Sequence, residues 1–393
     1  MRAVYIPVGA TGHVLASLPM VGELVARGVE VLYFAPERYR VAVEGTGASF
    51  CAMPAIAAGG GSVSAGEDFL ASLPLVFLGE AMGVVDTVMP ACEAFAPDVV
   101  LSDELALCGR LVAAKMKLPL VMVFTSYAPC EQFSICRFWP RYPDTHPARA
   151  KAHALAQELT QVYGVRHLDI YEIFEGRGDF NVSTLTREFQ PAGDSFGADF
   201  LFAGAQIAPR ADAPRWQPPG DGKPVLYTSL GSLFTNWPEF YQTLFPIVEK
   251  MDIHVVCATG GLKTVGEPCR VPQNVQLLPF APQLEILPHA SAFITHAGTG
   301  SAMEALYHGV PCVCLPQMEE QQLTARRLME MGGAAAFIHR PELTGELLEH
   351  AIVTALYDSE VRERARKAAL RTRAGSSPAY AAQGIINFMA LRL

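Results

Sequence analysis

Short apolar runs alternate with amphipathic stretches along the chain, and this alternation constrains its fold more than any other feature. The segments between the runs carry apolar residues at helical spacing, for example Leu18, Val21 and Leu24. Strands that alternate with helices are typical of βαβ units and of a parallel sheet. The runs predicted as strands in the first half are Ala3–Val8, Val29–Ala35, Gly47–Met53, Pro97–Asp103, Leu118–Thr125, Phe180–Thr184 and Phe200–Ala203.

A proline-rich segment, residues 208–223, interrupts this pattern with the sequence APRADAPRWQPPGDGK. Prolines mixed with small and charged residues, without any period, are typical of a linker. The strand pattern then starts again, so we predict an α/β chain with a first domain at 1–207 and a second at 224–375, both doubly wound. The strands expected in the second half are Pro224–Ser229, Ile253–Ala258, Val275–Leu278, Ala292–Thr295 and Val310–Leu315.

Two segments of the first half are harder to interpret. Residues 57–90 mix glycines with apolar patches, which indicates a loop followed by a helix. Residues 127–187 are aromatic and punctuated by prolines, so they either line an apolar pocket for a small molecule or pack helices together. Both interpretations stay open at this point.

The composition excludes several classes of protein. The 393 residues are 50% hydrophobic and 18% charged with a net charge of −9, which favours a large core and argues against nucleic acid as a partner. We find no apolar run of membrane-helix length and read the N-terminus as a first strand rather than a signal peptide. The nine cysteines are scattered without CxxC pairs, which favours a reduced, cytoplasmic protein with no zinc site.

Polar residues follow two of the predicted strands in the first domain. His13 opens a helix after a glycine turn, where the helix dipole disfavours the imidazolium form, so it is a candidate general base. Asp103 ends the strand Pro97–Asp103, and a carboxylate there could accept a hydrogen bond from His13 and fix its tautomer. The alternatives are that His13 caps its helix or meets a phosphate, and that Asp103 caps the next helix. Glu104 is a neighbouring carboxylate that complicates the assignment.

In the second domain, a strand, a small-residue turn and a helix opening together predict an anion site. His296 ends the strand, and residues 297–301 (AGTGS) lead into the helix. A helix N-terminus offers unpaired N–H groups and partial positive charge, and glycines let a phosphate approach the backbone. Ser229, Gly231 and Ser232 form a second turn of this kind. Because the chain has no Asp-x-Asp motif, we expect these donors to stabilise a diphosphate without a metal.

The stretch from Phe280 to Gln321 resembles the nucleotide-sugar signature of GT-B-fold glycosyltransferases. The group it resembles contains the plant enzymes of secondary metabolism and the bacterial macrolide glycosyltransferases. It contains an aromatic-x-Pro-Gln (280–283), a His-x-Gly-x-x-Ser (296–301), a glutamate (Glu304) and an acidic-Gln pair (320–321), all at the expected spacing. The resemblance implies two Rossmann-like domains that face each other across a cleft. It also implies that the C-terminal helix, residues 376–393, crosses back to the first domain.

The resemblance also implies roles for individual residues. His13 would be the catalytic base, in a setting matched by Gly12 and Pro19, and Asp103 its partner. Phe280 would stack near the nucleotide base, in a position where the family usually has Trp, and this leaves open whether the donor is a UDP or a TDP sugar. Gln283 would lie near the nucleoside, Glu304 would bind the ribose, and Glu320 with Gln321 the sugar hydroxyls, which favours glucose. The residues predicted to bind the donor are Ser229, Gly231, Ser232, Phe280, Gln283, His296, Gly298, Thr299, Gly300, Ser301, Glu304, Glu320 and Gln321.

The sequence therefore predicts an inverting, metal-independent glycosyltransferase that uses a nucleotide sugar, UDP-glucose by preference, and needs no other cofactor. The expected acceptor is a hydroxyl of an apolar small molecule such as a polyketide, a macrolide or a phenolic. A sugar-nucleotide epimerase with the same architecture and a non-catalytic glycosyltransferase-like partner protein are the alternatives. The oligomeric state stays open.

Overall fold

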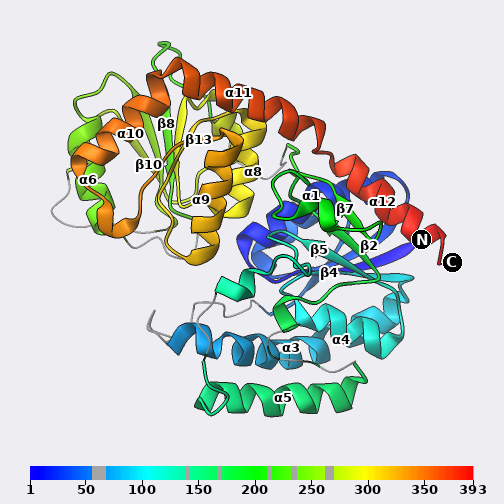
Figure 1. Ribbon diagram of the computed structural model, residues 1–393. Coiled ribbons are helices and arrows are strands. Elements are labelled where there is room, and N and C mark those ends of the chain that lie inside the picture. Colours follow the sequence, from blue (N-terminus) through cyan, green and yellow to red (C-terminus); the bar gives the residue numbers. More distant parts are fainter. Residues whose placement is uncertain are drawn as a thin grey trace. The chain divides into compact units, whose positions relative to one another are not determined.

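A computed structural model describes residues 1–54, 68–138, 142–165, 168, 170, 172–209, 215–231, 237–261 and 270–392. The chain divides into two compact units (Figure 1). The first unit comprises Met1–Asp212 together with Ser376–Leu393, and the second comprises Ala213–Gly375. Each unit is built on a sheet whose described strands all pair in parallel.

The sheet of the first unit has the strand order β3-β2-β1-β4-β5-β6-β7 among the described residues. The order reverses between β1 and β4, where Ile6 pairs with Ser102. Such a reversal is the topological switch point of an open α/β sheet, the usual place for a ligand. The strands are β1 (Arg2–Ile6), β2 (Glu30–Ala35), β3 (Ser49–Ala52), β4 (Val99–Asp103), β5 (Leu120–Phe124), β6 (Phe180–Ser183) and β7 (Phe200–Phe202).

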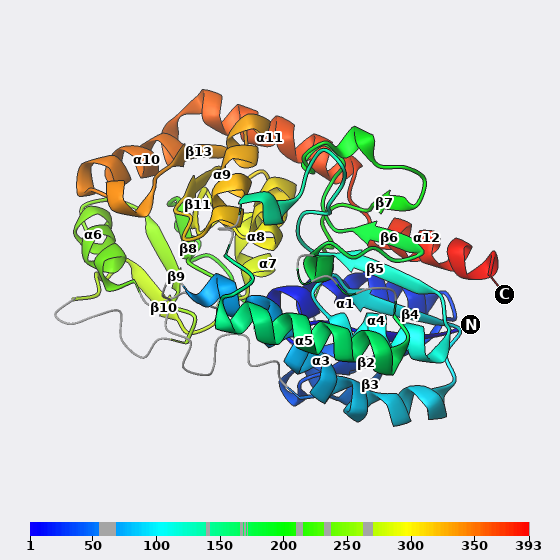
Figure 2. The same cartoon turned by 60° about the horizontal axis from the view of Figure 1, so that its bottom comes forward.

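Helices cover both faces of this sheet, as a doubly wound fold requires. On one face, α1 packs on β2 and on α12, and α12 packs on β6 and β7, with Leu18, Tyr5 and Ile385 in one core (Figure 2). On the other face, α3, α4 and α5 form a second core. The helices of this unit are α1 (Thr11–Ala26), α2 (Arg40–Glu44), α3 (Asp68–Phe95), α4 (Leu107–Met116), α5 (Pro147–Tyr163) and α12 (Pro378–Ala390).

The C-terminal helix α12 is part of the first unit although it follows the second in sequence. Ser377 caps it by accepting the Tyr380 N–H at 3.1 Å, and Pro378 occupies its first turn. The Ser377 N–H bonds to the Ala203 carbonyl at 2.8 Å, and Phe388 stacks on Phe180 with ring centroids 5.3 Å apart. These contacts attach the end of the chain to β6 and β7.

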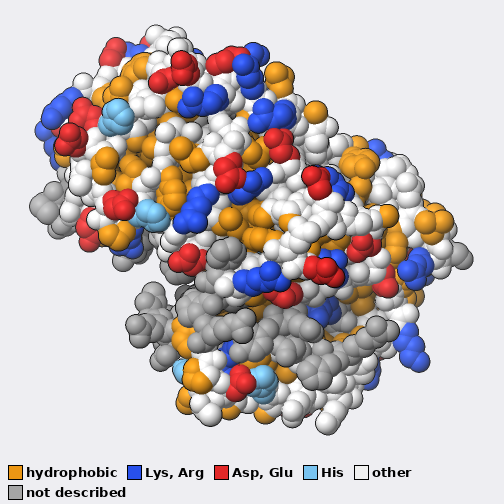
Figure 3. All heavy atoms as spheres, in the orientation of Figure 1, with side chains coloured by type: hydrophobic (Ala, Val, Ile, Leu, Met, Phe, Trp, Pro, Cys, Tyr) orange, Lys and Arg blue, Asp and Glu red, His pale blue; other side chains and the backbone are white. Residues whose placement is uncertain are grey.

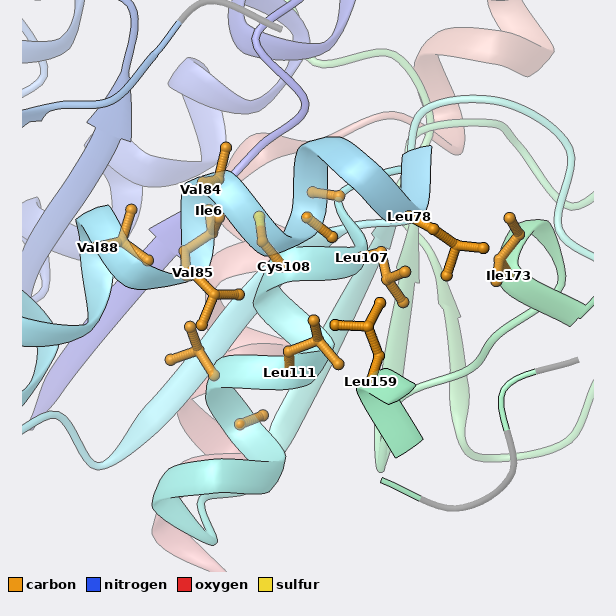
Figure 4. Packing of buried hydrophobic residues seen from close by; sticks show 14 of the residues in the cluster. Ile6, Leu78, Val84, Val85, Val88, Leu107, Cys108, Leu111, Leu159 and Ile173 are labelled. Carbon is orange, nitrogen blue, oxygen red and sulfur yellow. The ribbon is translucent and has the colours of Figure 1, made fainter. Parts of the chain in front are cut away.

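Helix α3 contradicts the expectation that no apolar run reaches membrane-helix length. By length and composition alone, Ala71–Phe95 is able to cross a membrane, with a mean hydropathy of 1.5. Its buried residues, however, recur at helical spacing along one face, which packs on α4 and α5 (Figure 4). Leu78, Val85 and Val88 of this face meet Leu111 and other side chains of the core. A core helix of a globular protein passes the same test of length and hydropathy, because the face that packs in the core must also be apolar.

The aromatic segment at 127–187 contributes packing to the first unit. Tyr127 is buried and contacts the rings of Phe133 and Phe189, and Phe174 meets Phe77 of α3 edge to face at 5.2 Å. These three contacts favour the packing interpretation for the aromatic residues they involve. Residues 139–141, 166–167, 169 and 171 lie outside the described part.

The sheet of the second unit has the order β10-β9-β8-β11-β12-β13 in the described part of the chain, and it reverses between β8 and β11. Thr295 pairs with Ser229 at that point. Its strands are β8 (Val225–Ser229), β9 (His254–Ala258), β10 (Val275–Leu278), β11 (Ala292–Thr295), β12 (Cys312–Cys314) and β13 (Ala334–Phe337). Its helices are α6 (Pro238–Val248), α7 (Gln283–Ile286), α8 (Thr299–His308), α9 (Glu319–Met331), α10 (Gly345–Tyr357) and α11 (Ser359–Ala374).

Strand β13 is absent from the strands that the sequence predicts. Its sequence is Ala-Ala-Ala-Phe, and alanine is the strongest helix former, so nothing local indicates a strand. It forms because Ala334 and Ala336 pair with Cys312 and Val313 at the edge of the sheet. Tertiary pairing here overrides local propensity.

Positive and negative side chains are mixed on the face of the molecule seen in Figure 3. No continuous stripe of Lys and Arg crosses the described residues of that face. Among its described residues, this face therefore lacks the basic stripe that is typical of a nucleic-acid-binding surface.

Candidate active site

His13 and Asp103 meet at the switch point of the first sheet. His13 is the third residue of α1, which begins just after β1, and Asp103 is the last residue of β4. Because β1 and β4 are neighbours, both side chains lie at the same edge of the sheet. The N-cap of α1 is Ala10, which offers no side chain to the first turn.

The His13 Nδ1–H donates to Asp103 Oδ2 across 2.6 Å. Asp103 is fully buried, and its other oxygen accepts the Leu105 N–H at 2.8 Å, whereas the His13 side chain keeps 19% of its surface exposed. A carboxylate can only accept, so this bond places the proton on Nδ1 and the lone pair on Nε2. The arrangement is that of a general base whose tautomer is held by a buried acid.

Thr125 and Glu104 complete this cluster, and the sequence analysis did not assign them. The Thr125 hydroxyl lies 2.9 Å from His13 Nδ1 and donates to Glu104 Oε1 at 3.1 Å. The same carboxylate accepts the N–H groups of Thr125 and Ser126 at 3.0 Å. Glu104 thus holds the chain just after β5 against the His13–Asp103 pair.

Burial, followed by the charge of Asp103, raises the pKa of Glu104 from 4.5 to about 8, while His13 and the Thr125 N–H act in the opposite direction. The ligating atoms of His13, Asp103 and Glu104 lie within 4.8 Å of one another, so the three residue types are suitable for a metal. Both carboxylates, however, already accept N–H and O–H groups, which favours a proton-transfer site.

The predicted anion turn of the second unit lies at the switch point of its own sheet. Ser229 is the last residue of β8, Gly231 follows that strand, and His296 follows β11. Gly231 has φ of +91°, a conformation that favours glycine. Thr299, Gly300 and Ser301 form the first turn of α8, whose N-cap Gly298 provides no side-chain hydrogen bond. Ser232 lies outside the described residues.

His296 is held between two glycines. A Cβ on Gly231 would lie 2.8 Å from His296 Nε2, and one on Gly298 would lie 2.6 Å from it. Burial lowers the pKa of His296 to about 4, so the ring is neutral near pH 7. Its Nδ1 is buried without a partner among the described residues, which favours an unprotonated Nδ1 and an N–H on Nε2. That N–H is a donor at the glycine turn.

Gln283, Ser301 and Glu304 are joined directly. The Gln283 amide nitrogen donates to Ser301 Oγ at 3.1 Å and to Glu304 Oε2 at 2.6 Å. Its oxygen accepts the hydroxyl of Tyr227, which is on β8, at 3.2 Å. Three predicted residues from α7 and α8 therefore form one hydrogen-bonded group, and Tyr227 is an addition that the sequence did not indicate.

The remaining predicted residues lie at the same edge of the sheet or on the loops beyond it. Phe280 has 73% of its surface exposed, and a Cβ on Gly261 would lie 3.3 Å from the tip of its ring. Glu320 is in the first turn of α9, and Gln321 next to it is buried.

Gln317 connects two parts of this site. Its N–H donates to Gln321 Oε1 at 2.8 Å, and its side-chain amide donates to the Leu230 carbonyl at 3.1 Å. The start of α9 is thereby tied to the turn after β8. A glutamine just past a predicted strand was the available signal for this residue.

Comparison with known proteins places the chain among enzymes that transfer sugars. Residues 243–388 match the family model described as erythromycin biosynthesis protein CIII-like, C-terminal domain. The chain is 30% identical over 397 residues to the demethyllactenocin mycarosyltransferase of Streptomyces fradiae, covering 96% of this chain and 84% of that protein. It is 29% identical over 361 residues to the NDP-glycosyltransferase YjiC of Bacillus licheniformis, covering 90% and 89%.

Solved structures agree with this result over nearly the whole chain. The calicheamicin glycosyltransferase CalG4 matches with a TM-score of 0.82 and 28% identity, covering 99% of this chain and 98% of that one. The glycosyltransferase of kitacinnamycin matches with a TM-score of 0.85 and 28% identity over the same shares. The predicted GT-B fold with two Rossmann-like units is confirmed.

Proposed function

Since the chain belongs to the family of macrolide and secondary-metabolite glycosyltransferases and transfers a sugar from an NDP-sugar to a small-molecule acceptor, we propose that it is an inverting O-glucosyltransferase that uses UDP-glucose. His13 acts as the base and Asp103 as its partner. The observation that carries this proposal is the 2.6 Å bond from His13 Nδ1 to the fully buried Asp103, at the switch point of the first sheet.

The His13–Asp103 pair explains how a hydroxyl becomes a nucleophile. The lone pair on His13 Nε2 takes the proton of the acceptor hydroxyl as its oxygen bonds to the anomeric carbon. Asp103 stabilises the imidazolium that forms, because it is a buried negative charge in contact with the ring. The bond from the anomeric carbon to the diphosphate breaks on the opposite side, so an α-linked donor gives a β-glycoside and free UDP.

The leaving diphosphate needs donors, and the second unit offers three kinds. These are the His296 N–H, the first-turn N–H groups of α8 with the Thr299 and Ser301 hydroxyls, and the turn that Ser229 and Gly231 begin. A neutral His296 donates without adding a charge that would have to be desolvated. We propose that these groups replace the metal ion that other sugar transferases use.

Recognition of the nucleoside and the sugar is assigned to the residues around this turn. The exposed ring of Phe280 stacks on the pyrimidine, and the carboxylate of Glu304 accepts the ribose hydroxyls. Glu320 offers acceptor oxygens to the sugar. Gln321 is left with its amide nitrogen as a donor, because its oxygen is already engaged by Gln317. The Gln321 amide as a donor and the Glu320 carboxylate as an acceptor together fit two neighbouring sugar hydroxyls. This pair therefore favours glucose over a sugar that lacks one of those hydroxyls.

The acceptor that we propose is a polyketide, a macrolide or a phenolic. The similar proteins include an oleandomycin glycosyltransferase and a demethyllactenocin mycarosyltransferase, and these names support an acceptor of this kind. Because the described cysteines are all free, we also propose a reducing compartment, the cytoplasm.

The test is a matrix of donors and acceptors followed by mass spectrometry. UDP-glucose, UDP-galactose, dTDP-glucose and a dTDP-deoxysugar are each incubated with macrolide, anthracycline and flavonoid acceptors, and the anomeric configuration of the product is read by NMR. We expect a β-glucoside from UDP-glucose. A product that retains the α configuration overturns the mechanism, and interconversion of the nucleotide sugar without transfer indicates an epimerase instead.

A further inference from the structure

Tyr227 contacts two of the proposed donor-binding residues, Gln283 and Ser229, although it has no motif of its own. It is on β8 with 1% of its surface exposed, and its ring stacks on Phe293 of β11 with centroids 4.7 Å apart. Its hydroxyl reaches the edge of the sheet and lies 3.2 Å from Gln283 Oε1. A buried tyrosine usually ends on a polar partner, and here that partner is a predicted binding residue.

The direction of each hydrogen bond in this group follows from chemistry. Burial raises the pKa of Tyr227 well above its ordinary value, with hydrogen bonding from Ser229 acting against it, so the phenol keeps its proton. The phenol therefore donates to the oxygen of the Gln283 amide. Glu304 fixes the same orientation from the other end, because a carboxylate accepts only from the amide nitrogen, here at 2.6 Å.

This orientation determines what the site can offer to a ligand. One N–H of Gln283 goes to Ser301 Oγ and the other to Glu304 Oε2. Since Ser301 accepts from the amide, its own O–H can donate, as a phosphate oxygen requires. The amide of Gln283 binds one oxygen of Glu304, and a carboxylate offers only acceptors, so Glu304 is suited to hydroxyl groups that donate.

We propose that Tyr227 is a positioning residue of the donor site. It orients the Gln283 amide, which in turn sets Ser301 as a donor and Glu304 as an acceptor. The ligand that fits this polarity is a ribonucleoside diphosphate, whose phosphate accepts and whose ribose hydroxyls donate. This inference rests on the proposed donor site. It gives Gln283 the task of aligning its neighbours, in addition to its place near the nucleoside.

Tyr227→Phe removes the hydroxyl and keeps the ring that stacks on Phe293. We expect the Kd for UDP, measured by calorimetry, and the KM for the donor to rise together by about 3- to 10-fold, with kcat within about 2-fold of wild type, because one neutral hydrogen bond is lost. Tyr241→Phe is the matched control. Tyr241 is a buried tyrosine on α6 that packs on Phe240 and Phe245, and its variant should bind UDP as the wild type does.

A double-mutant cycle separates positioning from a purely structural role. If Tyr227 acts through Gln283, then adding Tyr227→Phe to Gln283→Met has no further effect on the Kd for UDP. Additive losses, or a Tyr227→Phe variant that binds UDP like the wild type, overturn the inference. A wild-type protein that binds neither UDP nor dTDP instead overturns the donor site itself, so the two failures are distinguishable. Thermal melting of each variant shows whether a loss of binding reflects a loss of fold.

Discussion

Asp103→Asn tests the base assignment more closely than removal of the carboxylate would, because it changes one atom and keeps the shape. The two oxygens of Asp103 have different partners. Oδ1 accepts the Leu105 N–H at 2.8 Å, and Oδ2 accepts the His13 Nδ1–H at 2.6 Å. An asparagine in this place has one oxygen and one NH2 group for these two positions.

The Leu105 N–H decides which way the asparagine faces. An NH2 group opposite that backbone N–H would oppose two donors, so the amide oxygen takes the Oδ1 position. The NH2 group then faces His13 Nδ1, which must accept, and the ring proton moves to Nε2. His13 Nε2, which should take the proton of the acceptor hydroxyl, now carries a proton itself, so the base is present in the wrong tautomer.

The size of the effect follows from these two losses. A charge-assisted hydrogen bond contributes about 1.5–3 kcal/mol, roughly a 10- to 100-fold change in rate. The unfavourable tautomer adds to this, and the same exchange in a serine protease triad lowers kcat by about 10⁴-fold. We expect kcat of Asp103→Asn to fall by at least about 10³-fold, with the Kd for UDP unchanged.

The assay is initial-rate transfer to the best acceptor, followed by calorimetry with UDP. Asp98→Asn is the matched control, because Asp98 directly precedes β4 and its carboxylate accepts only the backbone N–H of Arg2 in the described contacts, at 2.7 Å. That variant should keep wild-type rates. An Asp103→Asn enzyme within 10-fold of wild type would refute the reasoning.

Three further predictions concern the glycine turn around His296 and the cluster of Thr125 and Glu104 beside His13. Gly298→Ala places a Cβ 2.6 Å from His296 Nε2, at a backbone φ of −64° that alanine tolerates. The Kd for UDP should therefore rise by about 10- to 100-fold. The control is Gly345→Ala, which has open space around its Cβ and should leave the Kd unchanged. Thr125→Val keeps the side-chain shape and removes the hydroxyl near His13 Nδ1, so kcat should fall by about 2- to 10-fold, and an unchanged kcat would exclude a role for this hydroxyl. The pKa of Glu104 is raised from 4.5 to about 8 in the folded protein, so the folded form binds more protons than the unfolded form between these values, and the stability that Glu104 contributes is lost as pH rises through 8. In urea titrations from pH 5 to 8, the stability of Glu104→Gln should therefore increase relative to wild type, and a constant difference would contradict this assignment.

The sequence predicted the elements that are defined by local chemistry. β10 and β11 have the bounds that apolar runs indicate, and the polar residues expected at strand ends lie either on the last strand residue, as Asp103 does, or just beyond it, as His296 does. The rule that ligands bind at strand ends placed His13 and Asp103 near one edge of a sheet, and the resemblance to the glycosyltransferases then made them base and partner.

The residues that sequence analysis missed are defined by distant partners. Tyr227 is in the middle of a buried strand, where nothing separates it from a core tyrosine until Gln283 is placed beside it. Thr125 directly follows β5 and was within reach of the same rule, but a lone threonine indicates little chemistry until its hydroxyl is found 2.9 Å from His13 Nδ1. β13 required its pairing with β12, since three alanines indicate a helix.

The central claim is that His13 removes the acceptor proton while the donor binds independently of it. Its most direct test compares wild type and His13→Ala, both by the transfer of glucose from UDP-glucose and by the Kd for UDP. We predict that transfer falls by about 10²- to 10⁴-fold, the range of general-base catalysis, and that the Kd stays the same. A His13→Ala enzyme that transfers sugar at the wild-type rate would contradict the account.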